Sequence, residues 1–199
     1  MGTTSVIKTR TFAEKLKKMG GYWLDAPVSG GTTAAEDGTL TIMAGGPQDT
    51  FHRALPTLQI LGDRITHVGE IGAGQIAKSA NQMIVGLTIG AVAEAFALAK
   101  HNGVDPAKIR EALFGGFAHS RILELHGERM LTEDFNPRAK CSIQRKDIAE
   151  AMELAASVKL HLPGLSTNMK LWDLMIENGW AELDHSALLL AIDPQWNKK

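Results

Sequence analysis

A single lysine stands near the start of the most apolar segment of the sequence. Lys78 lies in an otherwise uncharged stretch, and Asn81 and Gln82 follow at the spacings that place three side chains on one helix face. Apolar surroundings lower the pKa of an amine, so a lysine held there can give and take a proton as a general acid and base. A lysine that extends from a helix end into solvent is the alternative, and the spacing alone favours neither reading.

A second group of polar donors follows a short apolar strand. The segment Asp25–Gly31 reads DAPVSGG, so Ser29 offers a hydroxyl while Gly30 and Gly31 offer unhindered backbone amides. Such donors can bind a carboxylate. In open α/β sheets, ligands bind where strands end. Taken by itself, however, the segment is more often an ordinary loop.

The segment 72–77, GAGQIA, matches the glycine fingerprint of dinucleotide-binding proteins. In that motif, the glycines let backbone amides at a helix N-terminus approach a pyrophosphate. Here a long helical pattern follows the glycines, and no strand with a ribose-binding acid comes after it. The sequence therefore favours a glycine-rich entry into a buried helix over a nucleotide site.

The remaining chemical motifs are weak. Asp184, His185 and Ser186 have the residue types of a catalytic triad, but adjacent helical residues point in different directions. The seven histidines have no spacing typical of metal ligands, so we predict no metal site.

The first 70 residues predict a mixed α/β domain that positions the DAPVSGG segment. Hydrophobic periodicity and glycine or proline breaks indicate a helix, a short strand into the Gly30-Gly31 turn, a strand, a second helix and a third strand. Pro56 either interrupts the second helix or marks a second short turn. The corresponding ranges are Ser5–Met19, Tyr22–Val28, Thr39–Ala44, Gln48–Leu61 and Ile65–Val68. Three short strands are typical of the end of a larger parallel sheet.

Residues 71–199 predict an all-helical domain. Its first helix, Gly74–Lys100, is apolar on every face, so we expect burial on all sides. Further helices are predicted over Pro106–Leu113, Ser120–Leu131, Gln144–Ser157, Gly164–Asn178 and Ala181–Ala191. A helix as apolar as the first one also predicts a homo-oligomer that covers it.

Composition excludes several classes of protein. The chain of 199 residues is 44% hydrophobic and 22% charged, with a net charge of -1. It lacks the basic excess of a nucleic-acid or membrane-surface binder. The longest uncharged apolar stretch, Ser79–Ala93, is shorter than a membrane span. Cys141 is the one cysteine, which is typical of a reducing compartment, and we expect a cytoplasmic protein.

Taken together, these segments resemble the β-hydroxyacid dehydrogenase family, which includes 3-hydroxyisobutyrate dehydrogenases and tartronate semialdehyde reductases. The DAPVSGG segment resembles the substrate-binding motif of that family. The spacing of Gly69, Gly72, Gly74, Lys78 and Asn81 resembles its catalytic motif. The resemblance covers the whole chain. It implies a remnant of a Rossmann-type α/β sheet in residues 1–70, joined by a long interdomain helix to an all-α helical domain in residues 71–199.

The resemblance also implies roles for individual residues. Lys78 would be the catalytic acid and base, assisted by Asn81. The other implied residues bind ligands: Ser29, Gly30, Gly31 and Gln82 the substrate, and Thr3 and Lys146 the nicotinamide cofactor. The implied activity is an NAD- or NADP-dependent interconversion of a small 3-hydroxy acid and its semialdehyde.

One part of the family pattern has no counterpart in this sequence. The pyrophosphate-binding half, roughly 90 residues with the true glycine fingerprint, would precede Met1. The chain is therefore expected to lack the cradle for the cofactor's phosphates. A different class of function stays open for this reason, namely a non-catalytic module that binds a carboxylate or dimerises.

Overall fold

The computed structural model describes residues 1–196, and the chain forms two compact units. The first unit comprises Met1–Gln82 and Ala149–His161, and the second comprises Met83–Ile148 and Leu162–Lys199. Two helices, α4 (Ala73–His101) and α7 (Cys141–Ser157), contribute residues to both units. The predicted change from mixed to helical structure is confirmed, because the last strand ends at Gly69, just before α4. The division into domains at residues 70 and 71 stays a prediction.

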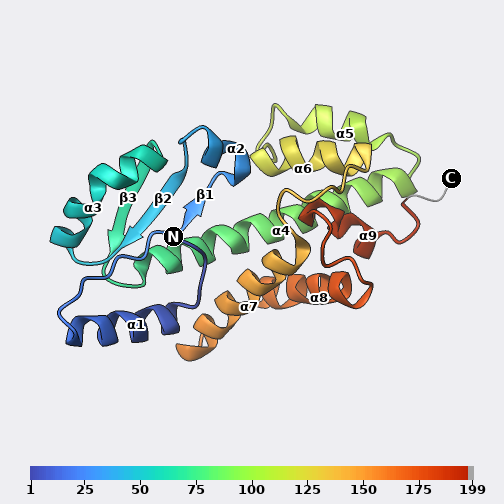
Figure 1. Ribbon diagram of the computed structural model, residues 1–199. Helices are drawn as coiled ribbons and strands as arrows, with labels where there is room; N and C mark the ends of the chain where they lie inside the picture. The colour runs from blue at the N-terminus through green and yellow to red at the C-terminus, as the bar shows by residue number, and fades with distance from the viewer. Residues whose placement is uncertain (197–199) are drawn as a thin grey trace. The chain divides into compact units, whose positions relative to one another are not determined.

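The first unit contains a small mixed sheet (Figure 1). Its strands are β1 (Val28–Ser29), β2 (Thr41–Gly45) and β3 (Arg64–Gly69), in that spatial order. β2 runs antiparallel to β1, with Val28 opposite Ile42, and parallel to β3, with Ile42 opposite Ile65. The second and third strands were predicted at nearly these positions, but the strand predicted over Tyr22–Val28 is regular only at Val28 and Ser29. The antiparallel pairing, in contrast, differs from the purely parallel sheet that we expected.

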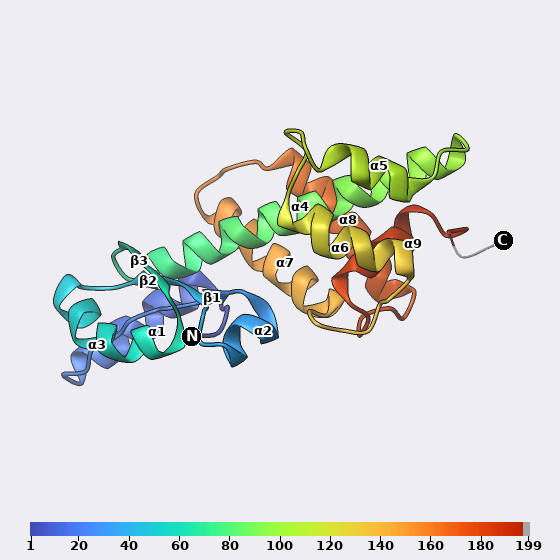
Figure 2. The same cartoon turned by 90° about the horizontal axis from the view of Figure 1, so that it is seen from above.

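Three helices accompany the sheet in the chain. They are α1 (Val6–Lys18), α2 (Gly31–Glu36) and α3 (Gln48–Leu61). Figures 1 and 2 show α3 beside β2 and β3. Buried apolar side chains from the sheet and α3 form the core of this unit, namely Ala26, Leu40, Ile42, Ala44, Phe51 and Leu58. α1 begins where the hydroxyl of Ser5 accepts a hydrogen bond from the backbone N–H of Lys8, as expected for a helix N-cap.

The prediction that Pro56 interrupts a helix is wrong, because α3 runs unbroken from Gln48 to Leu61. Proline removes the bond that its N–H would donate to the carbonyl four residues earlier, here that of His52. Both Pro56 and His52 are exposed, so water can bind the carbonyl that loses its partner. The helix therefore tolerates the proline on its outer face.

Helix α2 was not predicted. It occupies six residues directly after the Ser-Gly-Gly turn, and none of them is buried. An element this short has no hydrophobic periodicity, so the glycines were read as an ordinary turn.

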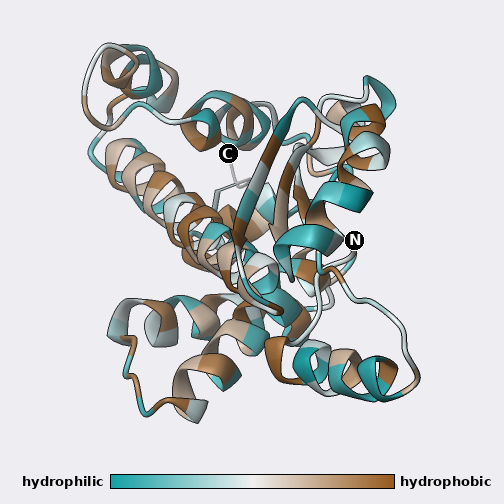
Figure 3. Ribbon diagram, turned by 90° about the vertical axis from the view of Figure 1, so that its left-hand side faces the viewer, coloured by the Kyte–Doolittle hydropathy of each residue, from teal (hydrophilic) through white to brown (hydrophobic). Residues whose placement is uncertain are grey.

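The second unit is helical, as predicted. Besides its parts of α4 and α7, it contains α5 (Pro106–Leu113), α6 (Arg121–Thr132), α8 (Pro163–Glu177), the short 3₁₀ helix η1 (His185–Ala187) and α9 (Leu188–Ile192). Asp105 and Ser120 cap α5 and α6 with side-chain oxygens that accept from backbone N–H groups. Figure 3, which colours the whole chain by hydropathy, shows helical ribbons that alternate between hydrophobic and hydrophilic segments, the pattern of helices with one face toward a core.

The predicted helix over Ala181–Ala191 is wrong in its first half. The backbone there pairs with the loop before α7: Asp184 and His185 donate to the carbonyls of Phe135 and Ala139, and Leu183 accepts from Cys141. These bonds occupy groups that a helix would need internally. Regular structure begins only after Asp184, whose carboxylate accepts from the backbone N–H of Ser186.

Helix α4 is not buried on every side in the single chain. Ile84 and Leu98 are 66% and 68% exposed. By length and composition, α4 could also cross a membrane. The sequence predicted otherwise, because the uncharged stretch Ser79–Ala93 is shorter than a membrane span. Core helices of soluble proteins can have the same length and composition.

Candidate active site

Lys78 lies in the second turn of α4, and its side chain is buried, with 9% of the residue exposed. That burial does not fit the alternative of a lysine that extends into solvent. One turn further along the helix, the Asn81 side-chain amide donates to the Gln82 Oε1 at 2.8 Å. The two amides are therefore linked to each other on the helix that carries the lysine.

Ser29, Gly30 and Gly31 form the exit from β1 into α2. Gly30 and Gly31 have φ values of 139° and 72°, which favour glycine. A Cβ on Gly30 would come within 2.5 Å of the Ala34 Cβ, so a larger residue does not fit. Both glycines are exposed, and no side chain caps the start of α2 in the described structure. The two glycines are therefore required by the backbone of this turn, and its binding of a carboxylate stays a prediction.

Asp25 joins this strand segment to the start of α4. Its Oδ1 accepts from the backbone N–H of Gly72 at 2.7 Å, and its Oδ2 accepts from that of Gln75 at 2.9 Å. These are amides that the glycine fingerprint would direct at a pyrophosphate. An internal carboxylate occupies them instead, which agrees with the interpretation of the glycines as a helix entry.

Close packing explains why residue 74, at the start of α4, is a glycine. A Cβ on Gly74 would lie 2.3 Å from the backbone oxygen of Met43 in β2 and 2.9 Å from the Asp25 Oδ2. Only glycine lets the helix approach the strand this closely. The pattern GAGQIA therefore serves the contact between helix and sheet.

The segment around Thr3 is attached to the same helix. The side chain of Gln75 donates to the Gly2 carbonyl at 2.9 Å and accepts from the Thr4 N–H at 3.1 Å. Thr3 itself is half-buried between these two anchored residues. Sequence reasoning missed both Asp25 and Gln75, because their bonds span 47 to 73 residues along the chain.

The first unit thus contains seven of the predicted site residues: Thr3, Ser29, Gly30, Gly31, Lys78, Asn81 and Gln82. Lys146 belongs to the second unit, on α7. Its Nζ lies 2.8 Å from the Oδ1 of Asp147, a carboxylate that is 2% exposed. The structure therefore groups all the predicted substrate and catalytic residues, with Thr3, in one unit.

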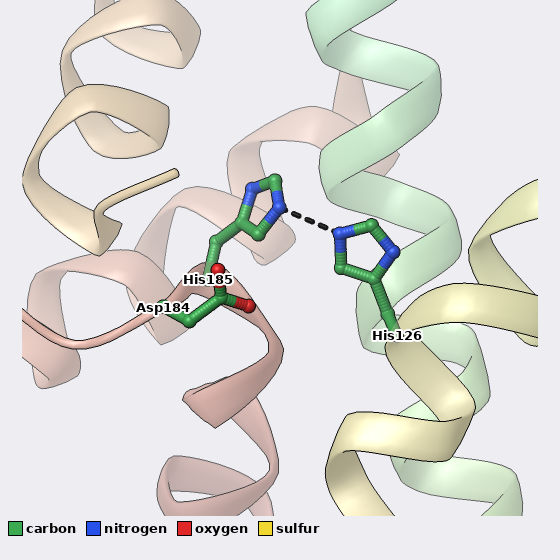
Figure 4. Close-up of side chains that lie close together, drawn as sticks. All are labelled: His126, Asp184 and His185. Atoms are coloured by element: carbon green, nitrogen blue, oxygen red, sulfur yellow. Dashed lines mark hydrogen bonds between the residues drawn. The ribbon is translucent and has the colours of Figure 1, made fainter. Parts of the chain in front are cut away.

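A second cluster of titratable groups lies in the helical unit (Figure 4). His126 of α6 and His185 of η1 face each other with their Nε2 atoms 2.6 Å apart. The Asp184 carboxylate lies nearby, and ligand-type atoms of the three residues are all within 4.8 Å of one another. The two histidines are 59 positions apart, so spacing rules did not find the pair. As expected, Asp184, His185 and Ser186 form no triad, since Ser186 donates directly to Asp184 at 2.7 Å.

This cluster suits a histidine pair better than a metal ion. Tetrahedral zinc would hold two imidazole nitrogens about 3.3 Å apart, and each ring would donate its other N–H to a partner. Here the nitrogens are closer, and both Nδ1 atoms are buried without a hydrogen-bond partner among residues 1–196. The carboxylate of Asp184 already accepts from Arg129, Arg138, Ala139 and Ser186.

Burial determines the charge state of the pair. Burial, together with neighbouring His185 and Arg129, lowers the pKa of His126 to about 3. Burial likewise lowers the pKa of His185 to about 4. Burial alone would raise the pKa of Asp184, but hydrogen bonds from Ser186 and the backbone of Arg138 hold it below its usual value. At neutral pH, the pair is therefore uncharged beside an ionised carboxylate.

Two family models match the chain in sequence. The model of the NAD-binding domain of 6-phosphogluconate dehydrogenase matches residues 1–69. The model described as the NAD-binding domain of NADP-dependent 3-hydroxyisobutyrate dehydrogenase matches residues 72–192. Together they account for nearly all of the described residues.

Individual proteins resemble the chain over most of its length. The 2-hydroxy-3-oxopropionate reductase of Escherichia coli is 47% identical over 199 residues, which are 100% of this chain and 68% of the relative. The 3-hydroxyisobutyrate dehydrogenase of Pseudomonas aeruginosa is 33% identical, over 90% of this chain and 61% of the relative. The chain thus spans about two thirds or less of the length of these curated relatives.

A solved structure shows the same fold. The 3-hydroxyisobutyrate dehydrogenase of Mycobacterium tuberculosis, solved with L-serine, superposes with a TM-score of 0.87 at 30% identity. The alignment covers 96% of this chain and 68% of the other. The expected fold class, a partial α/β sheet followed by a helical domain, is thereby confirmed.

Proposed function

Because the chain belongs to the β-hydroxyacid dehydrogenase family, we propose that it interconverts a small 3-hydroxy acid and its semialdehyde with Lys78 as the proton carrier. The preferred substrate is 2-hydroxy-3-oxopropionate (tartronate semialdehyde), because the similarity to the E. coli reductase extends over the whole chain. The burial of Lys78 in the unit that also holds the Ser-Gly-Gly turn is the structural observation that carries this proposal.

The turn after β1 supplies the anion site. The Ser29 hydroxyl and the backbone N–H groups of Gly30 and Gly31 donate hydrogen bonds to the substrate carboxylate. Both glycines lack a side chain that could shield these amides, and both have a positive φ. This contact fixes one end of a three-carbon substrate, so its carbonyl has one orientation relative to α4.

Lys78 manages the proton at the other end. As the semialdehyde is reduced, the Nζ of Lys78 donates a proton to the carbonyl oxygen, and in the reverse direction the amine takes it from the hydroxyl. The linked amides of Asn81 and Gln82 donate to the same oxygen or to the substrate. A buried amine is suited to this exchange, since its charged form is not stabilised by bulk water.

The residues present fit one part of the cofactor. Both family models are NAD-binding models, so the cofactor is NAD or NADP, which supplies the hydride when bound. The turn that holds Thr3 is fixed to α4 and suits a nicotinamide contact, and Lys146 is proposed for a second contact. The amides of the glycine segment already bind Asp25, so they do not fit the pyrophosphate.

Substitution of the lysine tests the proposal. Lys78→Ala is expected to lower kcat for reduction of tartronate semialdehyde by about 10²- to 10⁴-fold, the usual contribution of a general acid. Binding of the unreactive carboxylate tartronate should change little, because that contact belongs to Ser29–Gly31. Oxidation of NADH or NADPH, followed by absorbance, gives kcat, and calorimetry gives the dissociation constant of tartronate.

Lys170→Ala is the matched control, because this lysine is exposed on α8. It should keep the kcat of the unsubstituted protein. Equal rates for Lys78→Ala and Lys170→Ala would refute the role of Lys78. An unsubstituted protein that binds tartronate but neither NADH nor NADPH would instead indicate the non-catalytic, carboxylate-binding module.

A further inference from the structure

We propose that Asp25 and Gln75 are positioning residues that hold the cofactor-binding turn and the substrate-binding strand on the helix of Lys78. The inference rests on the proposed function, since it assigns these two residues a part in that reaction. Neither residue reaches the reacting atoms in this proposal. They act through Thr3, Ser29 and Lys78, because they fix the positions of these residues relative to one another.

Asp25 connects the strand to the helix at both its backbone and its side chain. Its backbone N–H and carbonyl both bond to Gly45 of β2, at 3.0 and 2.7 Å. Its two carboxylate oxygens bond to the N–H groups of Gly72 and Gln75. Hydrogen bonds to an ionised acceptor are stronger than neutral ones, and a negative charge is favoured at a helix N-terminus. The residue is 4% exposed, so water competes little for these bonds.

This link sets the distance between Ser29 and Lys78. Ser29 follows Asp25 by four residues of extended chain, about 13 Å at most. Lys78 follows Gln75 by three residues of helix, a rise of about 4.5 Å. The buried carboxylate of Asp25 is therefore one of the contacts that fix the amine relative to the Ser-Gly-Gly turn.

Gln75 extends the same arrangement to the N-terminal segment. Its backbone N–H is bound by Asp25, while its side-chain amide pairs with the Gly2 carbonyl and the Thr4 N–H. It is 3% exposed. A single amide thus satisfies one donor and one acceptor on either side of Thr3, which fixes the turn that we propose for the nicotinamide.

The surrounding packing leaves little room for adjustment. A Cβ on Gly45 would lie 2.6 Å from the backbone nitrogen of Gly74 and 2.9 Å from the Asp25 Oδ2. Strand, carboxylate and helix are therefore in direct contact. A shift of even a fraction of an ångström at Asp25 must move the helix as well.

Two substitutions, made in the full chain, separate the role of Gln75 at the Thr3 turn from the role of Asp25 at the strand and α4. Gln75→Met keeps the length of the side chain but removes its two hydrogen bonds. We expect the KM for the nicotinamide cofactor to rise about tenfold, with kcat and the KM for tartronate semialdehyde within about twofold. Asp25→Asn keeps only part of the helix cap and should instead lower kcat about tenfold or more, because it alters the position of Lys78 relative to the substrate.

Thr9→Val is the matched control, since Thr9 is a buried polar residue of the same unit whose hydroxyl has no hydrogen-bond partner in the part of the chain that the structure describes. It should leave all three kinetic constants unchanged. Amide hydrogen exchange supplies a readout that does not depend on activity. The Thr4 N–H should be protected in the unsubstituted protein and should lose that protection in Gln75→Met.

The outcomes distinguish this inference from the proposed function. In one outcome, the unsubstituted protein is active while both variants show the same pattern, a lower kcat and higher KM values for cofactor and substrate in the same proportion. That result would show a structural role only and overturn the inference. An unprotected Thr4 N–H in the unsubstituted protein would overturn it as well. An unsubstituted protein without any dehydrogenase activity refutes the proposed function, and the positioning role is refuted with it.

Discussion

Local sequence patterns point to some functional residues of this chain and not to others. Lys78 is conspicuous because it is the one charge in a long apolar stretch, and Ser29–Gly31 because glycines follow a strand. Asp25 and Gln75 look ordinary, since their importance lies in bonds to residues 47 to 73 positions away. Local composition predicts exposed chemical groups and helix faces, but such long-range bonds require the folded chain.

The neutral histidine pair predicts a pH-dependent stability. A histidine that is protonated near 6.5 when unfolded, but only near 3 or 4 when folded, binds more protons in the unfolded state between those values. The free energy of unfolding should therefore have its full value above about pH 6.5 and should fall as the pH drops toward 4. Each such histidine contributes up to about 1.4 kcal/mol per pH unit.

His126→Gln tests that dependence, because glutamine can still bond to His185 but does not titrate in this range. Urea unfolding at a series of pH values should show a shallower slope for His126→Gln than for the unsubstituted protein. The control is His161→Gln, at an exposed position. The idea fails if His126→Gln and His161→Gln have the same slope.

At the scale of elements, glycine positions decide how closely helix α4 approaches the sheet. Gly74→Ala should destabilise the protein by about 2 kcal/mol, because the overpacking against Met43 outweighs the better helix propensity of alanine. Gly115→Ala is the control, since no described atom of another residue beyond its chain neighbours lies within 4 Å of its added Cβ. Chemical unfolding measures both, and an unchanged midpoint for Gly74→Ala would contradict the packing argument.

The sequence predicted the elements well where capping and periodicity agreed. The bounds of α5 match the prediction because Asp105 caps it and Pro106 begins it. The prediction failed where tertiary bonds replaced local ones, as in residues 181–185, whose backbone pairs with the loop before α7. It also failed at Pro56, where solvent exposure removes most of the cost of a proline in a helix.

At the scale of the whole molecule, the apolar surface of α4 predicts self-association. Leu98 is 68% exposed in the single chain, and a copy of the same helix would cover it. Leu98→Lys should therefore shift the protein toward the monomer in light scattering coupled to size-exclusion chromatography. Ile60→Lys, at an exposed position of α3, should not. A monomeric unsubstituted protein at every concentration tested would rule this prediction out.

The carboxylate of Asp25 at the start of α4 has one further consequence. The helix end that most resembles a phosphate cradle carries a built-in counter-ion, tethered to the neighbouring strand and unaffected by dilution. Free phosphate or nucleotide in the medium must compete with the high effective concentration of this tethered carboxylate. The pyrophosphate of a dinucleotide must therefore be bound by groups other than these amides, and a motif scan that stops at GAGQIA would assign it to the wrong place.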